Sequence, residues 1–272
     1  MHKYTIFNRK NVFISMVSLF KKILEWLAFI FGAKENNIEI VQTGEIESGE
    51  TQEVIEQEET EEMETHIITV LLDNGHASST PGKRSPKEEG VDQFFEYEFN
   101  RDIVHRIAEK LDKIGIKYEV LVPEVDEDIS LSTRAARANK FCKEYGKENC
   151  VFISVHANAA GNGTEWKNAR GWCCYTSKGE TASDTYAEIF MKCANDVLVP
   201  LKQKIRKYSA KKYSWEENFT VLVKTNCAAI LTENMFYDNK DDLKFLQSDE
   251  GREAIAQIHI DAILEIEKNL GA

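Results

Sequence analysis

The chain has 272 residues, 42% of them hydrophobic, so it can bury one full-sized core and still carry an appendage. Its formal net charge of -12 is concentrated, because residues 35–64 hold twelve Glu and no Lys or Arg. Outside that segment the charges balance and no basic stripe remains, which argues against nucleic acid as a partner.

Residues 1–34 are predicted to form an amphipathic N-terminal helix. Polar side chains recur within it at three- and four-residue spacing: Ser15, Ser18, Lys22 and Glu25. Each charge at the centre of a membrane span would cost about 2.5 to 3.5 kcal/mol, which disfavours a spanning helix. A secretory signal is also disfavoured, because no clear small-residue cleavage site follows the apolar stretch. We expect residues 12–32 to contact a membrane surface, with packing on the rest of the chain or on a second copy as the alternative.

Residues 35–65 are predicted to be a disordered, Glu-rich linker. They combine dense like charge with few aromatic residues, so they cannot bury enough surface to offset the entropy of ordering. The folded domain is therefore expected to span residues 66–272.

Apolar runs and helical patterns alternate through that domain. Strands are expected at 66–72, at 117–122, at 150–155 and in the run that ends at Thr232; helices are expected at 96–114, 132–145, 185–199 and 250–270. Continuous apolar strands separated by helices are typical of a mostly parallel sheet. The fold class is therefore α/β, a single-domain sandwich with a mostly parallel central sheet flanked by helices.

The six cysteines show no CxxC pair and no spacing of a zinc ribbon or a disulfide framework. We expect buried free thiols. Cys173 and Cys174 would point to opposite faces of a strand, so they should not pair with each other.

Three apolar runs end in a group that can bind metal or move a proton. The first is followed by His76, the second by His156 and the third by Glu233. In open α/β sheets the ligand crevice lies beyond the carboxyl ends of the strands, so these groups should meet at one edge. Two histidines could supply two ligands of a catalytic zinc, which takes three protein ligands and keeps one position open. Spacing alone leaves the third ligand open among five acidic residues: Glu88, Glu89, Asp92, Glu96 and Glu98.

Four motifs resemble those of a known family. LLDNGH at 71–76, EYEFN at 96–100, SVHANA at 154–159 and ILTEN at 230–234 are similar, in order and spacing, to motifs of the zinc-dependent N-acetylmuramoyl-L-alanine amidase family, Amidase_3. The resemblance covers about residues 67–270. It implies hydrolysis of the amide between the lactyl group of N-acetylmuramic acid and L-alanine of the peptidoglycan stem peptide.

Carried over position by position, the resemblance implies one Zn²⁺ held by His76, Glu96 and His156. Glu233 would be the catalytic base. Glu96 is chosen because an asparagine follows it at the family spacing, and Glu98 is its nearest competitor. Peptidoglycan is the implied partner, and the cell envelope is the favoured location, with cytoplasmic storage until lysis if the enzyme serves a phage.

The sequence departs from the family at two places. Ala77 replaces the second glycine of Gly-His-Gly, which would strain the loop if that position needs a positive φ. The residues after Glu233 differ from the usual Leu-Gly-Phe. Both departures concern loop shape, since every ligand and the base are retained.

Substrate contacts are expected from side chains near the same edge. Asn158 could hydrogen-bond substrate, Arg84 and its neighbour Lys83 could meet stem-peptide carboxylates, and Trp166 could stack on a sugar. Two other functions compete with the amidase: a zinc peptidase acting within the stem peptide, and a peptidoglycan-binding module without catalysis.

Overall fold

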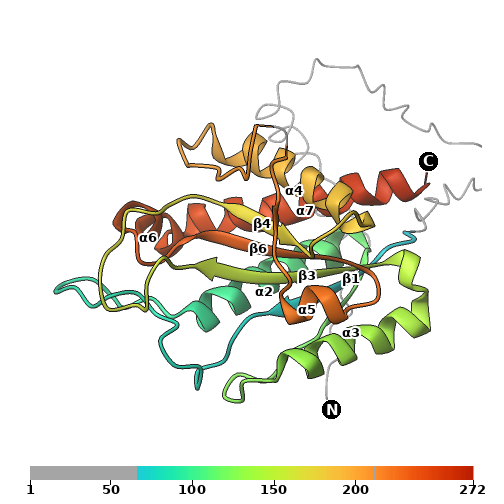
Figure 1. Ribbon diagram of the computed structural model, residues 1–272, viewed down its shortest axis with the longest axis horizontal. Helices are drawn as coiled ribbons and strands as arrows, with labels where there is room; N and C mark the ends of the chain where they lie inside the picture. Colours follow the sequence, from blue (N-terminus) through green and yellow to red (C-terminus); the bar gives the residue numbers. More distant parts are fainter. Residues whose placement is uncertain (1–65, 211, 272) are drawn as a thin grey trace, which may run out of the picture. The chain divides into compact units, whose positions relative to one another are not determined.

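The computed structural model describes residues 66–210 and 212–271, in which strands and helices alternate around a single sheet (Figure 1). The strands are β1 (Thr69–Asn74), β2 (Lys117–Val120), β3 (Cys150–Asn158), β4 (Cys173–Thr176), β5 (Trp215–Glu216) and β6 (Ala228–Phe236). The helices are α2 (Glu96–Ile114), α3 (Leu131–Tyr145), a short 3-10 turn η1 (Lys147–Asn149), α4 (Ala182–Leu198), α5 (Thr220–Lys224), α6 (Lys240–Gln247) and α7 (Asp249–Gly271).

The sheet has the strand order β2-β1-β3-β6-β4-β5. The pairs β1–β2, β1–β3, β3–β6 and β4–β5 are parallel, while β4 runs antiparallel to β6. The mostly parallel sheet is confirmed. The carboxyl ends of β1, β3 and β6 therefore lie next to one another at the same edge.

Helices cover both faces of this sheet (Figure 1), which explains why β1 is buried along its whole length and β3 is buried as far as Val155. Alternate strand residues, such as Val70 and Ile153, pack in one hydrophobic cluster with α2, α4 and α7. The residues between them, such as Leu71 and Phe152, pack with α3 and α5 on the other face. The three-layer arrangement confirms the α/β sandwich.

Helix α2 begins and ends where the sequence pattern predicts. Phe99, Ile103, Ile107 and Leu111 form its buried stripe. Gly115 ends the helix with φ 88°, a left-handed conformation that glycine adopts readily, and its N–H donates to the carbonyl of Leu111. The first residue of this helix, Glu96, is also buried.

The elements that the sequence pattern does not predict are short. β4 has four residues, β5 two and α5 five, so none shows a full period of its own. The eight-residue α6 is a further such element. β1 begins at Thr69 and not at His66, because its partner β2 reaches only to the level of Thr69. Strand β3 runs three residues beyond its expected end, and that extension includes His156.

All six cysteines are free, and five of them are buried; Cys193 is half-buried. The expected amphipathic helix at 12–32 and the linker at 35–65 lie outside the described residues. Within the ranges 66–210 and 212–271, no helix combines the length and apolar character needed to cross a membrane.

His259 on α7 is a fully buried histidine that touches the sheet. Its Nδ1 donates to the carbonyl of Ile255 at 2.8 Å, so its Nε2 can accept from the hydroxyl of Thr232 at 3.0 Å. Burial lowers the pKa of His259 to about 4, because the charged ring would lose its hydration.

Replacing His259 by Gln should make the free energy of unfolding depend less on pH below pH 6.5. The unfolded histidine binds a proton near pH 6.5 and the folded one only near pH 4, so its contribution is present above pH 6.5 and is lost as pH falls towards 4. Over that range we expect the wild type to lose up to about 3 kcal/mol more unfolding free energy than His259→Gln. Urea unfolding at several pH values measures this. His105→Gln, an exposed position on α2, is the control, and parallel profiles for all three proteins would contradict the prediction.

Candidate metal centre and active site

The structure brings the two strand-end histidines and the strand-end glutamate to one edge of the sheet. His76 lies two residues after β1, His156 lies near the end of β3, and Glu233 lies in β6. The register pairs His156 directly with Glu233 on the neighbouring strand, so both side chains project from the same face, the one covered by α3 and α5. This is the convergence that the apolar runs predict.

The third member of the cluster is Glu96, the first residue of α2. Its Oε1 lies 3.0 Å from Nδ1 of His156 and 3.4 Å from Nε2 of His76. One ligand atom from each of the three side chains lies within 4.8 Å of the other two. Among the described residues, no other group of three His, Cys, Asp or Glu has this metal-binding arrangement.

The other acidic candidates stay outside the cluster. Glu98 is exposed and accepts a hydrogen bond from the hydroxyl of Tyr97. Glu88 pairs with Lys240 at 2.7 Å. The backbone N–H of Glu96 donates to the carbonyl of Lys83, which fixes the start of α2 against the preceding loop and directs the Glu96 side chain inward.

Charge and burial oppose each other within the cluster. Burial acts to raise the pKa of Glu96, but hydrogen bonds from His156 and His76 outweigh it and hold that pKa below its ordinary value. Burial lowers the pKa of His76, whereas the contact with Glu96 outweighs burial at His156 and raises its pKa. Oε2 of Glu96 is buried without a hydrogen-bond partner, although Nζ of Lys83 lies 3.8 Å away. An oxygen of this kind is available to a cation.

Glu233 has the environment of a proton acceptor. Its Oε2 is buried and has no hydrogen-bond partner. Burial raises the pKa of Glu233 to about 7, with the charge of His156 opposing the rise and that of Glu96 adding to it. A cation bound beside it would lower this pKa again. A carboxyl group tuned towards neutral pH is suited to general base and general acid work.

The loop that carries His76 depends on a close approach to His156. A Cβ added at Gly75 would lie 2.0 Å from Cε1 of His156, so any other residue at this position would displace the imidazole ring from the place it occupies. The rings of His76 and His156 meet edge to face, with centroids 4.9 Å apart.

The two departures from the family pattern have different outcomes in the backbone. The left-handed residue of Gly75-His76-Ala77 is His76, with φ 63°, and Ala77 is not among the residues with positive φ. The strain expected at Ala77 is therefore absent. Met235, in the segment that differs from Leu-Gly-Phe, does adopt φ 66°, next to a shift of register between β3 and β6.

Two hollows meet at the cluster. The larger, of about 550 Å³, extends towards α3 and α5, and the smaller, of about 270 Å³, extends over the loop after β3. His156, Glu233 and Lys83 line both hollows. A substrate that occupied both would therefore cross the cluster beside Glu233.

Only some of the residues expected to contact substrate line the hollows. Asn158 lines the smaller hollow, where its Oδ1 accepts from the N–H of Ala159. Arg84 is exposed and Trp166 packs partly against the core under Lys240, and neither lines either hollow. Lys83, the neighbour of Arg84, is the basic side chain that reaches the cluster.

A family model described as N-acetylmuramoyl-L-alanine amidase, Amidase_3, matches residues 70–265. The match contains the whole sheet except Thr69, and it contains the His76, Glu96, His156 and Glu233 positions.

Individual relatives agree with that match. The endolysin of Bacillus phage SPP1 is 30% identical over 202 residues, which are 72% of this chain and 65% of the endolysin, so the chain spans less than two-thirds of that relative. The N-acetylmuramoyl-L-alanine amidase from Clostridium difficile 630 is 25% identical with a TM-score of 0.59, over 74% of this chain and 97% of that one. The catalytic domain of the amidase CwlV from Bacillus (Paenibacillus) polymyxa var. colistinus has a TM-score of 0.59 at 21% identity, over 73% of this chain and 97% of that one, which shows a shared fold.

Gly75→Ala should abolish metal binding at the cluster, because the added Cβ and the ring of His156 cannot occupy the same space. Zinc retained after dialysis, measured by mass spectrometry of the metal, should fall from one equivalent towards none. Gly90→Ala is the matched control, since its Cβ would meet nothing within 4 Å and only a backbone cost of about 1 to 2 kcal/mol applies. Full zinc content in Gly75→Ala would show that the close approach is not required.

Proposed function

The chain belongs to the N-acetylmuramoyl-L-alanine amidase family, and on that premise we propose that it is a zinc-dependent peptidoglycan amidase. The bond cleaved is the amide between the lactyl group of N-acetylmuramic acid and L-alanine. The observation that carries the proposal is the meeting of His76, Glu96 and His156 beside Glu233, at an edge with two hollows.

The side chains of the cluster fit zinc. Two imidazoles and a carboxylate with an open side are a common donor set of catalytic zinc sites. Tetrahedral ligands about 2.0 to 2.2 Å from zinc lie roughly 3.3 to 3.6 Å apart, and the contacts of Glu96 with His76 and His156, at 3.4 and 3.0 Å, are close to that spacing. The unpartnered Oε2 of Glu96 adds to the fit. Zinc held there would polarise the scissile carbonyl and make the attacking water more acidic.

Glu233 is the proposed catalytic base. Its carboxylate takes a proton from the attacking water and then delivers it to the nitrogen of the departing L-alanine, so one group serves both proton transfers. Burial raises the pKa of this carboxyl in the metal-free protein and a bound cation opposes that rise, so the two effects act on the same proton-transferring group in opposite directions. No nucleophilic serine or cysteine is needed in this scheme.

The substrate would lie across the cluster with its two parts in the two hollows. Asn158 is the proposed hydrogen-bonding contact in the smaller hollow, and Lys83 is the proposed contact for a stem-peptide carboxylate. Contacts from Arg84 and Trp166 stay sequence-based proposals, which the hollows support less because neither side chain lines them.

The N-terminal part of the chain is proposed to place this domain at the cell envelope. Residues 12–32 would contact a membrane surface, and residues 35–65 would link that segment to a catalytic domain that begins at residue 66. The relatives include both a phage endolysin and bacterial amidases, so lysis and wall remodelling are both consistent with the family.

Glu233→Gln tests the proposed base. The amide keeps the shape of the side chain but cannot accept the proton, so we expect hydrolysis to fall about 10²- to 10⁴-fold while bound zinc stays at one equivalent. The assay is the release of amino groups from purified peptidoglycan by the full chain. Glu98→Gln, at an exposed position that lines neither hollow, should behave as wild type. Undiminished activity in Glu233→Gln would remove the proposed base.

Lys83→Met and Arg84→Met separate the two basic neighbours. If Lys83 holds a substrate carboxylate, its loss should raise KM about tenfold, since a hydrogen bond to a charged group contributes roughly 1.5 kcal/mol. Arg84→Met should leave KM unchanged, because Arg84 lines neither hollow. Steady-state kinetics on a soluble muropeptide measures both constants, and a larger rise for Arg84→Met would restore Arg84 as the contact.

A further inference from the structure

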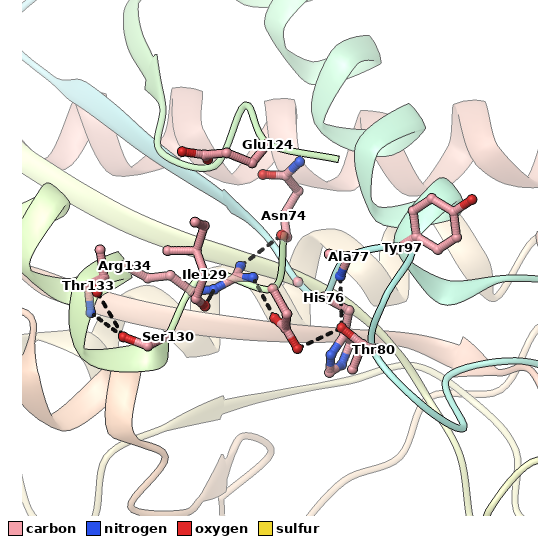
Figure 2. Close-up of polar contacts among 12 residues, drawn as sticks. Asn74, His76, Ala77, Thr80, Tyr97, Glu124, Ile129, Ser130, Thr133 and Arg134 are labelled. Atoms are coloured by element: carbon pink, nitrogen blue, oxygen red, sulfur yellow. Dashed lines mark hydrogen bonds and ion pairs between the residues drawn. The ribbon is translucent and has the colours of Figure 1, made fainter. Parts of the chain in front are cut away.

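Three consecutive backbone carbonyls, those of Asn74, Gly75 and His76, each accept a hydrogen bond from a side chain. Nη1 of Arg134 donates to the carbonyl of Asn74 at 2.9 Å, which Figure 2 shows, and Nδ2 of Asn100 donates to that of Gly75 at 3.0 Å. Nη1 of Arg101 donates to the carbonyl of His76 itself at 2.9 Å. Three donors from two helices thus fix three consecutive peptide groups.

The loop needs such fixing because His76 has φ 63°. A residue with a Cβ pays roughly 1 to 2 kcal/mol to adopt the left-handed region, so the free loop would favour other conformations. Those conformations would turn the imidazole away from Glu96 and His156. The carbonyl of His76 follows directly on the strained φ, which makes its hydrogen bond the one most closely tied to the direction of the ring.

The charged side chain of Arg101 contacts main-chain oxygens. Its guanidinium donates to three backbone carbonyls, those of His76, Tyr97 and Glu124. Among the described residues no carboxylate forms an ion pair with it, although burial and the nearby Arg134 disfavour its charge and lower its pKa. A partly buried cation whose hydrogen bonds all go to main-chain oxygens serves to hold those segments together.

One helix therefore sets two of the three ligands. Glu96 opens α2, and Arg101 lies five residues further along the same helix. Helix α2 carries the ligand Glu96 and, through Arg101, is hydrogen-bonded to the backbone of the ligand His76. A rigid helix with both contacts fixes the distance between these two ligands.

We propose that Arg101 is a positioning residue, which holds the backbone of His76 in its left-handed conformation and thereby sets the geometry of the zinc site. The inference rests on the proposed zinc site. Arg101 forms no hydrogen bond with a ligand side chain, so it acts on His76 through the backbone.

Arg101 allows a cleaner test than Arg134. Arg134 forms a buried ion pair with Asp73 at 2.8 Å, and its removal would leave a buried carboxylate unpaired and threaten folding. Removal of Arg101 leaves only carbonyl oxygens without a partner. Arg106, on the same helix but paired with surface acids such as Asp249, provides the control.

The experiment compares Arg101→Met, Arg101→Lys and Arg106→Met in the full chain. Zinc affinity is measured by competition with a chromophoric chelator, and the absorption spectrum of the Co²⁺-substituted protein reports the ligand geometry. We expect Arg101→Met to bind zinc at least about tenfold more weakly and to change the cobalt spectrum. Arg101→Lys, which can still donate to the carbonyl of His76, should recover part of both, and Arg106→Met should match the wild type.

Equal zinc affinity and an identical cobalt spectrum in Arg101→Met would overturn the inference, even if its thermal unfolding midpoint fell. Failure of the wild type to bind zinc is a separate outcome, which would overturn the proposed zinc site and this inference with it. If Arg101→Met does not fold, Arg101→Gln takes its place, because its polar side chain is two bonds shorter than the reach of the guanidinium nitrogens that hold the carbonyl of His76. A zinc affinity and a cobalt spectrum equal to those of the wild type in Arg101→Gln would overturn the inference.

Discussion

Parallel pairing of β1, β3 and β6 is the constraint on which the site depends. It brings the carboxyl ends of three strands to one edge, and its register sets His156 directly beside Glu233. A shift of one residue would turn one of the two side chains to the opposite face, among α2, α4 and α7. The apolar packing on both faces of the sheet therefore fixes the chemistry at its edge.

Burying charged groups at this edge of the sheet costs free energy. Ion pairs and hydrogen bonds with neighbouring residues offset that cost. Glu96 is buried between two histidines, and Arg134 is buried against Asp73. The hydroxyl of Ser154 donates to the same Asp73, so the ion pair joins α3, β1 and β3 below the ligands. Charges paired in this way cost less to bury than isolated ones, and they restrict the loop that carries His76 to one arrangement.

Periodicity in the sequence predicts one part of the site and leaves another open. His76, His156 and Glu233 stand at the ends of apolar runs, so the pattern of those runs is enough to predict that they meet. Spacing cannot choose the third ligand, because that choice depends on how the loop before α2 folds back through Lys83. The family resemblance selects Glu96, and that residue lies in the cluster. Contacts between segments that are far apart, such as Arg101 with the backbone of His76, leave no periodic pattern in the sequence.

The central claim, zinc-dependent cleavage at L-alanine, is tested most directly by the products of digestion. The full chain is stripped of metal by a chelator, divided, and supplied or not supplied with zinc before incubation with purified muropeptides. Mass spectrometry should then find intact stem peptide with a free L-alanine amine only where zinc was returned. Cleavage within the stem peptide, or identical cleavage without zinc, would contradict the account.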